Sequence, residues 1–195
     1  MKKKVSIVLD TSIFVNPDSR FLFGKTPQEA FANFLEELKG KESISCYIPP
    51  TVYEELIKFI EKAPPESKIK LVERKPPSIY EASIPAMLIY EFIEETRYRV
   101  NKGLRIAEKY ARKRIKPAVQ SPDQEEETIK KLRQEYRIAL REGIIDSKED
   151  FDLVLLAKEL KAYLATSDKG LIKWAQKLGI TCLAAEALKE FLSNP

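Results

Sequence analysis

The chain contains no histidine and few cysteines or glycines, and these shortages exclude several kinds of chemistry. Without histidine there is no histidine acid–base pair, no Ser-His-Asp triad, no Cys-His dyad and no His-ligated zinc site. Neither a Walker A motif nor a Gly-x-Gly-x-x-Gly pattern occurs, so nucleotide hydrolysis is not expected. Cys46 and Cys182 are far apart and each lies in an apolar, strand-like stretch. This context predicts buried free thiols in a reducing compartment.

Long apolar runs are also missing. Met1-Lys2-Lys3-Lys4 leads directly into the short apolar run Val5–Leu9, which is too short for a signal peptide or a membrane span, so we expect a cytoplasmic protein. A length of 195 residues and a hydrophobic content of 44% predict one compact domain with an insertion. A charged content of 33% is typical of thermophilic proteins. The net charge of +4 suits a polyanionic partner.

Two apolar stretches end in an aspartate. Val5–Leu9 is followed by Asp10-Thr11-Ser12, and Ala162–Ala165 is followed by Thr166-Ser167-Asp168. Runs of this kind predict buried parallel strands, and strands alternate with helices along the whole chain. We therefore expect an α/β fold with a parallel sheet of about four or five strands flanked by helices. The functional site is expected at the carboxyl edge of that sheet.

Further acids are expected near this edge. Asp146, Asp150 and Asp152 crowd the start of a strongly apolar helix that Ser147 can cap. After Pro49-Pro50, a helix places a glutamate in its first two turns, and spacing does not choose between Glu54 and Glu55.

Each aspartate has an ordinary explanation as a helix cap or a first-turn residue. Capping does not explain two strands that end in aspartate at one edge, with more aspartates beside them. Close carboxylates repel one another by roughly 4 kcal/mol per pair at an effective dielectric near 20, so the cluster requires divalent cations. The pattern predicts a metal-dependent nuclease. Asp152 is the least certain member, because positions two apart on a helix point away from each other.

A helical hairpin is expected to interrupt the core. Prolines punctuate residues 63–85, where we expect connectors and a short helix over Lys68–Val72, and a loop is expected over residues 16–25. Residues 85–141 then form the hairpin, with one arm over 87–116 that breaks near Gly103, a turn over 117–122 and a second arm over 124–141. The predicted core therefore comprises residues 1–84 and 142–195.

The first arm is strongly basic, and within its basic stretch only Glu108 opposes the positive charges. Charge runs are usually solvated helix faces, but the acids needed for pairing are missing from this stretch. Contact with nucleic-acid phosphates is therefore favoured. The candidate RNA-binding residues are Arg105, Lys109, Arg112, Lys113, Arg114 and Lys116. Surplus apolar side chains on both arms predict contact with another copy of the chain.

These motifs resemble those of the PIN-domain ribonucleases. The resemblance rests on the strand followed by Asp10-Thr11-Ser12, the segment Ile48–Leu56, the helix from Asp152 and the strand that ends at Asp168. It implies that Asp152 occupies the general helix position of that family and that Glu55 is its accessory glutamate. The Asp146–Asp152 run, the Asp168–Ala175 segment and the basic hairpin are similar, more specifically, to the minimal protein-only ribonuclease P family and its relatives described as RNA ligase partner proteins.

That second resemblance implies removal of the 5′ leader from precursor tRNA with Mg²⁺ or Mn²⁺, and a large homo-oligomer built through the hairpins, for which a dodecamer is one size. It implies that Asp10, Asp146, Asp150 and Asp168 are the catalytic and metal-binding acids. Which of Asp150 and Asp152 is a direct ligand stays open. Two alternatives remain. A toxin-like or general PIN endoribonuclease would usually be shorter and lack the hairpin, and a non-catalytic RNA-binding partner protein would not cleave RNA.

Overall fold

The computed structural model describes residues 4–62, 64–114, 122–141 and 147–193. The chain forms two compact units, one comprising Met1–Ser83 and Ile145–Pro195 and the other comprising Ile84–Ile144. The first unit contains the sheet, and the second is a pair of helices. None of the helices in the described ranges is long and apolar enough to cross a membrane.

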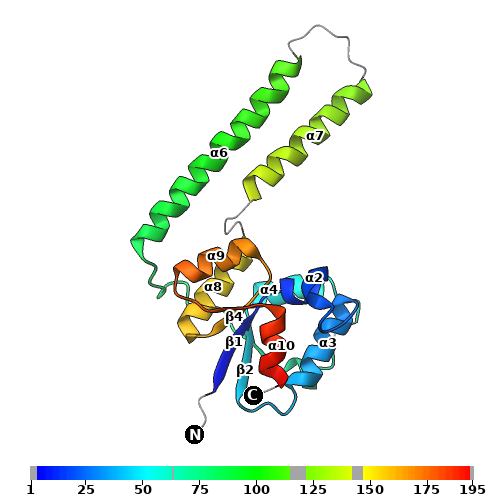
Figure 1. The fold of residues 1–195 in the computed structure, drawn as a ribbon, viewed down its shortest axis with the longest axis vertical. Coiled ribbons are helices and arrows are strands. Elements are labelled where there is room, and N and C mark those ends of the chain that lie inside the picture. Colours follow the sequence, from blue (N-terminus) through cyan, green and yellow to red (C-terminus); the bar gives the residue numbers. More distant parts are fainter. Residues whose placement is uncertain (1–3, 63, 115–121, 142–146, 194–195) are drawn as a thin grey trace. The chain divides into compact units, whose positions relative to one another are not determined.

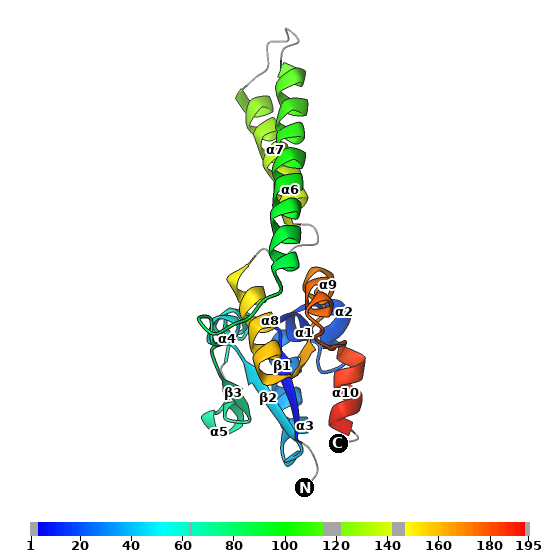
Figure 2. The same cartoon turned by 90° about the vertical axis from the view of Figure 1, so that its left-hand side faces the viewer.

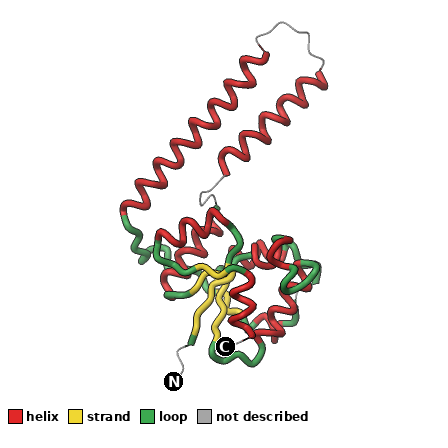
Figure 3. Tube along the Cα trace, in the orientation of Figure 1, coloured by secondary structure: helices red, strands yellow, loops and turns green. Residues whose placement is uncertain are grey.

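A parallel five-stranded sheet forms the centre of the first unit (Figure 3), which confirms the α/β fold expected from the sequence. The strand order β3-β2-β1-β4-β5 means that the chain moves outward from β1 on one side and later returns to β4 on the other. The carboxyl ends of β1 and β4 therefore flank the switch point of the sheet, where open parallel sheets bind their ligands. The strands are β1 (Val5–Leu9), β2 (Ile44–Ile48), β3 (Val72–Arg74), β4 (Tyr163–Ala165) and β5 (Cys182–Leu183).

Helices cover both faces of this sheet (Figure 1). Helix α8 (Lys148–Leu160) contacts β1, β4, α4 and α9, and its residues Leu153–Ala157 are all buried. On the other side, α3 (Pro27–Leu38) packs with α1 and α10, and the side chain of Thr26 caps its start. The remaining helices of this unit are α1 (Ser12–Val15), α2 (Pro17–Arg20), α4 (Pro50–Ile57), α5 (Glu66–Ile69), α9 (Lys169–Lys177) and α10 (Ala185–Ser193).

Two local expectations were wrong. The segment expected to be a loop contains the short helix α2, because Asn16 accepts a hydrogen bond from Asp18 N and caps this helix. The helix expected over Lys68–Val72 is α5 at Glu66–Ile69, and Val72–Arg74 is strand β3. Only Val72 of that strand is buried. A strand of this length shows no alternation of apolar and polar residues that a sequence pattern can detect.

Both cysteines are free thiols, as predicted. Cys46 lies in β2, and burial raises the pKa of its thiol to about 12. Cys182 is half-buried in β5, and burial raises the pKa of that thiol as well. Neither thiol is therefore a thiolate near neutral pH, and both act as small apolar residues.

The second unit consists of the antiparallel helices α6 (Ala86–Arg114) and α7 (Pro122–Arg141), which contact each other. They run side by side in Figure 1, and in Figure 2 α6 crosses in front of α7. Near one end of the pair, Arg99 Nη1 donates to Leu140 O at 2.5 Å. The helix break expected near Gly103 is absent, since α6 continues through it. A Cβ atom at Gly103 would lie 2.5 Å from the Tyr136 ring, so this glycine permits close contact between the arms. Most of the turn expected over 117–122 lies outside the described residues.

Candidate active site

Asp10 is the buried acid of the candidate site. It follows β1 directly at the switch point of the sheet, and only 6% of its surface is exposed. Its Oδ2 atom accepts hydrogen bonds from Ser12 Oγ at 2.5 Å and from Thr166 Oγ1 at 2.6 Å. Its Oδ1 atom has only a long contact of 3.4 Å with Thr11 Oγ1. One carboxylate oxygen is thus held by two donors, and the other is held weakly.

The same two hydroxyls connect Asp10 to the loop that follows β4. Ser12 Oγ accepts from Ser167 N at 2.8 Å, and Thr166 Oγ1 accepts from Asp168 N at 3.0 Å. Each hydroxyl therefore accepts a hydrogen bond from the backbone that follows β4 and donates its own proton to Asp10. We call Ser12 and Thr166 the hydroxyl pair. Sequence patterns did not single out this pair, although both residues lie next to the predicted aspartates.

Asp168 lies at the carboxyl end of β4 and caps α9. Its Oδ1 atom accepts a hydrogen bond from Leu171 N at 2.8 Å. Asp168 therefore caps a helix and also lies beside Asp10. The Asp168 charge contributes to the raised pKa of Asp10, which places the two acids within electrostatic reach of each other. The structure therefore places the two strand-end aspartates, Asp10 and Asp168, at one edge of the sheet, as expected from the sequence.

Glu55 reaches the site from α4, and Glu54 is exposed to solvent. Thr11 Oγ1 lies 3.4 Å from Glu55 Oε2, the same distance that separates it from Asp10 Oδ1. Burial is the main reason that the pKa of Glu55 is raised, followed by the charges of Asp10 and Glu149. Glu149, in the first turn of α8, is an additional acid of this region that sequence patterns did not single out.

The α8 acids expected at the site have different surroundings. Asp152 accepts a hydrogen bond from Thr51 Oγ1 at 2.8 Å, which connects α8 to the start of α4. Asp150 lies in the first turn of α8, where its backbone N–H donates to Ser147 Oγ at 3.0 Å, as the capping pattern predicts. Asp146 lies outside the described residues.

Burial dominates the electrostatics of Asp10 and raises its pKa above the ordinary value for aspartate. The hydrogen bonds from Ser12 and Thr166 counteract this effect, and the charge of Asp168 adds to it. A divalent cation would stabilise the charged form. Carboxylate and hydroxyl oxygens are the donors that hard divalent cations prefer, so this donor set fits a cation of that class. Within the described parts of the chain, no three acidic or cysteine side chains are grouped closely enough to form a metal site by themselves.

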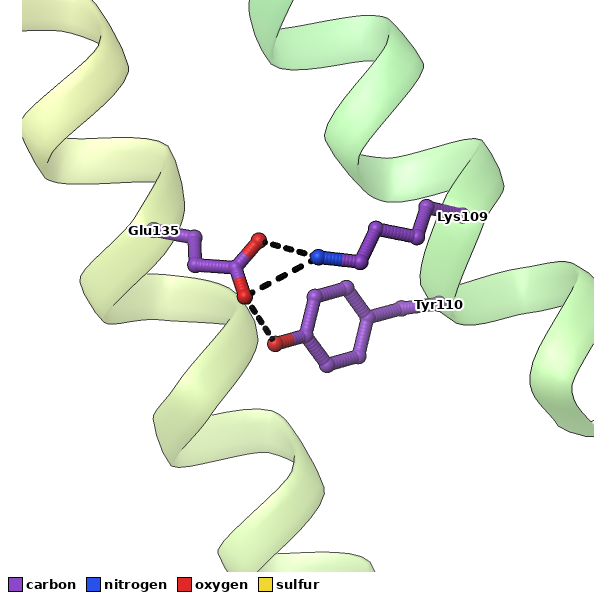
Figure 4. Close-up of polar contacts among 3 residues, drawn as sticks. All are labelled: Lys109, Tyr110 and Glu135. Atoms are coloured by element: carbon purple, nitrogen blue, oxygen red, sulfur yellow. Dashed lines mark hydrogen bonds and ion pairs between the residues drawn. The ribbon is translucent and has the colours of Figure 1, made fainter.

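The basic residues from Arg105 to Arg114 that are predicted to contact RNA lie on α6. Arg105 and Arg112 are exposed. Lys109 Nζ is paired with Glu135 Oε2 of α7 at 2.8 Å, and Tyr110 Oη donates to Glu135 Oε1 at 2.8 Å (Figure 4). Glu135 of the second arm therefore supplies Lys109 with an acidic partner that the basic stretch of the first arm does not provide. Lys113 and Arg114 complete α6, and Lys116 lies outside the described residues.

Parallel strands in this order, with a buried aspartate at the switch point and further acids around it, define a PIN-type ribonuclease domain. Residues 6–194 match the family model of the PINc domain ribonucleases. Members of this family generally use divalent metal ions.

The chain belongs, more narrowly, to the RNA-free ribonuclease P family. It is 48% identical to the RNA-free ribonuclease P of Thermodesulfovibrio yellowstonii, over 98% of this chain and 95% of that protein. It is 47% identical to the protein of the same name from Pyrococcus furiosus, over 97% of this chain and 94% of that protein. The expected family resemblance is confirmed, and thermophilic organisms are among the sources of these relatives.

Proposed function

We propose that this chain is an RNA-free ribonuclease P that removes the 5′ leader from precursor tRNA, using Mg²⁺ or Mn²⁺ at the acidic edge of its sheet. The observation that carries the proposal is an identity of 46–48% to six proteins named RNA-free ribonuclease P, over nearly the whole chain. The proposed substrate is made inside the cell, so the proposal also places the enzyme in the cytoplasm.

The acids would hold the cation, and the hydroxyl pair would hold the central acid. We assign catalytic roles to Asp10, Asp146, Asp150 and Asp168, with Asp152 as a further metal ligand and Glu55 as an accessory acid. Asp10 keeps a fixed orientation because Ser12 and Thr166 both donate to its Oδ2 atom. Its Oδ1 atom is the oxygen with a weaker hydrogen bond, and it is therefore better able to contact a ligand.

The reaction is hydrolysis of one phosphodiester bond. Water attacks the phosphorus, the bond to the leader's 3′ oxygen breaks, and the tRNA product keeps a 5′ phosphate. A bound divalent cation supplies the acidity that activates the water and the positive charge that stabilises the departing oxygen. The chain contributes carboxylates that position this charge and needs no histidine as a base, which is consistent with a sequence that has none.

We further propose that α6 of the hairpin binds RNA phosphates through its exposed basic residues. Arg105→Gln combined with Arg112→Gln should make the slope of log K against log salt shallower by about 0.7 to 0.9 for each arginine that binds a phosphate. Arg133→Gln combined with Arg137→Gln removes the same charge from exposed positions on α7 and is the matched control. If the two pairs change the slope equally, α6 is not a specific phosphate-binding arm.

We also propose that the hairpin assembles the protein into a homo-oligomer, for which a dodecamer is one size. An apolar stripe on α6 supports this, since Ile89, Ile93, Val100 and Leu104 fall within about 60° around the helix axis at 3.6 residues per turn. Their exposed fractions are 53%, 47%, 57% and 56%. A stripe of this kind is typical of a surface that another chain covers.

Cleavage of matched RNAs tests the proposed function. The purified protein should cut a 5′-extended precursor tRNA once, at the start of the mature tRNA, with Mg²⁺ and not with EDTA. An unstructured RNA of the same length and composition should not be cut at a single position. A general endoribonuclease would cut both RNAs at many places, and a non-catalytic partner protein would bind the precursor without cutting it. Either result overturns the proposal.

A further inference from the structure

Helix α9 begins at the candidate active site. Asp168 is its cap, with the side chain accepting from Leu171 N at 2.8 Å and the backbone carbonyl accepting from Ile172 N at 2.9 Å. The start of α9 is therefore fixed to the same residue that lies beside Asp10. Side chains on the solvent face of α9 extend away from the acids along a rigid element.

That solvent face is made of lysines. Lys169, Lys173 and Lys177 are all exposed and follow one another at intervals of four residues, which is a rise of about 6 Å along the helix for each step. Leu171, Trp174 and Ala175 are buried on the other side of the helix. The Lys177 ammonium lies 5.0 Å from the centre of the Trp174 ring, so its charge is held against the helix surface. We call Lys169, Lys173 and Lys177 the α9 lysine face.

Helix stability does not explain the lysines at the start and middle of α9, whereas Lys177 lies in the last turn, where the helix dipole favours a cation. The segment Lys169–Lys177 contains no aspartate or glutamate. Like charges four residues apart weaken a helix. A cation in the first turn is also unfavourable, because the helix dipole places positive charge there, and α9 has no acid in its first turn. A row of exposed lysines that begins at the candidate active site is suited to an anionic ligand outside the helix.

Positive charge next to the acids of the candidate site would help an RNA to bind there. Asp10, Glu55 and Asp168 repel the phosphates of an RNA for the same reason that they repel one another. A cation that neutralises the acids removes this repulsion locally but does not hold the neighbouring nucleotides. Lysines that begin at Asp168 and continue along α9 can attract the phosphates that flank the reacting one.

We infer that the α9 lysine face is a second RNA-binding site of this protein, which holds the RNA backbone next to the bond that is cut. The inference rests on the proposed function, because it assigns an RNA substrate to the neighbouring acids. The contacts are to phosphates and so carry no sequence information. This site differs from the hairpin because it belongs to the same compact unit as the acids.

Binding of a 5′-extended precursor tRNA, measured in EDTA so that no cleavage occurs, tests the inference. Replacement of Lys169, Lys173 and Lys177 by Gln should make the slope of log K against log salt shallower by about 2 to 3, at 0.7 to 0.9 for each phosphate that a lysine neutralises. Replacement of the same lysines by Arg should restore the wild-type slope. In Mg²⁺, the loss of binding in the Gln variant should appear as a higher KM.

The matched control removes the same charge at the opposite edge of the sheet. Lys4, Lys158 and Lys161 line a cavity of about 570 Å³ near the starts of β1 and β4. Their replacement by Gln should leave the slope and the cleavage rate unchanged. Equal slope changes in the two triple variants, or no change in the α9 variant, overturn the inference.

A folding defect would be detected by circular dichroism. If the triple variant is unfolded, Lys173→Gln alone replaces it, with an expected slope change of about 0.7 to 0.9. Failure of the proposed function is a separate result. A protein that does not cut the precursor refutes the function, whereas an unchanged slope in a protein that cuts it refutes the α9 site alone.

Discussion

Removal of the Thr166 hydroxyl should weaken the fold at the active site, and Thr166→Val is the variant that isolates this effect. Thr166 is fully buried. Because valine has nearly the same shape as threonine, the substitution leaves no cavity. It removes one hydrogen bond of 2.6 Å to the Asp10 carboxylate and one of 3.0 Å from Asp168 N. A hydrogen bond to a charged group contributes about 1.5 to 3 kcal/mol, and a neutral one about 0.5 to 1.5 kcal/mol. The free energy of unfolding should therefore fall by about 2 to 4 kcal/mol.

The matched control is Thr166→Ser, which keeps the hydroxyl and removes one methyl group. Its free energy of unfolding should fall by about 1 kcal/mol. For a protein of this size, each kcal/mol corresponds to about 2 to 4 °C in Tm. Thermal unfolding in EDTA should thus place the Tm of Thr166→Val clearly below that of Thr166→Ser. If Thr166→Val is as stable as Thr166→Ser, the hydroxyl pair does not hold Asp10 in the way described.

The effect should also depend on pH. Thr166 lowers the pKa of Asp10 by hydrogen bonding to its charged form, so its loss raises further a pKa that burial has already raised. At low pH the carboxyl group is protonated in both proteins, and the difference in stability is smaller, because only neutral hydrogen bonds are lost. As pH rises through the pKa values of Asp10, the variant loses more stability than the wild type. A difference that is constant between acid and neutral pH would contradict this explanation.

Further predictions concern the acids. Asp10→Asn should abolish most cleavage. It should also raise the Tm of the metal-free protein, and this gain should grow as pH rises. The reason is that the folded-state pKa of Asp10 is raised, so ionisation of its carboxyl group destabilises the folded wild type as pH rises through that pKa. Asp168→Asn should also remove most cleavage with little change in Tm, since asparagine caps helices as well as aspartate, and a large drop in Tm would show that the cap needs the charge. Asp152→Asn should retain more cleavage than Asp10→Asn, because Thr51 already donates a hydrogen bond to the Asp152 carboxylate, and equal losses would show that Asp152 is as important for cleavage as Asp10. Glu55→Gln should lower the cleavage rate and Glu54→Gln should not, and equal rates would remove Glu55 from the site.

A prediction for assembly concerns the apolar stripe on α6. Ile93→Glu combined with Leu104→Glu places charges on that stripe and should reduce the molar mass measured by light scattering during size exclusion. The wild type should have a mass well above that of one chain, which is 22.4 kDa. Tyr80→Glu is the control, because Tyr80 is 96% exposed in the other unit. A wild type that elutes as a single chain, or a variant with unchanged mass, would contradict assembly through α6.

The strand-end acids could be predicted because their placement follows from chain order alone. Parallel strands deliver their carboxyl ends to one edge, so Asp10 and Asp168 had to meet if both strands were real and adjacent. The hydroxyl pair could not be predicted in the same way. Its geometry depends on the pairing of β1 with β4, in which Leu9 faces Ala165, and one sequence contains no signal for that register.

The helices of the hairpin could also be predicted from the sequence, but the contacts between their side chains could not. Its helices follow from their apolar spacing, but the ion pair between Lys109 and Glu135 depends on how far one arm is shifted along the other. Gly103 was expected to break α6 because glycine weakens a helix. The structure instead shows Tyr136 packed on it, although the two residues are far apart in sequence. Patterns within one helix do not contain that information.

The most direct test of the central claim is to map both ends produced from a 5′-extended precursor tRNA in Mg²⁺, with wild type and Asp10→Asn compared side by side. We expect one cut by the wild type, a tRNA product that begins at the mature 5′ end with a 5′ phosphate, and a leader with a 3′ hydroxyl. We expect almost no cut by Asp10→Asn under the same conditions. A 5′ hydroxyl on the tRNA product, or full cleavage by Asp10→Asn, would contradict the proposed function.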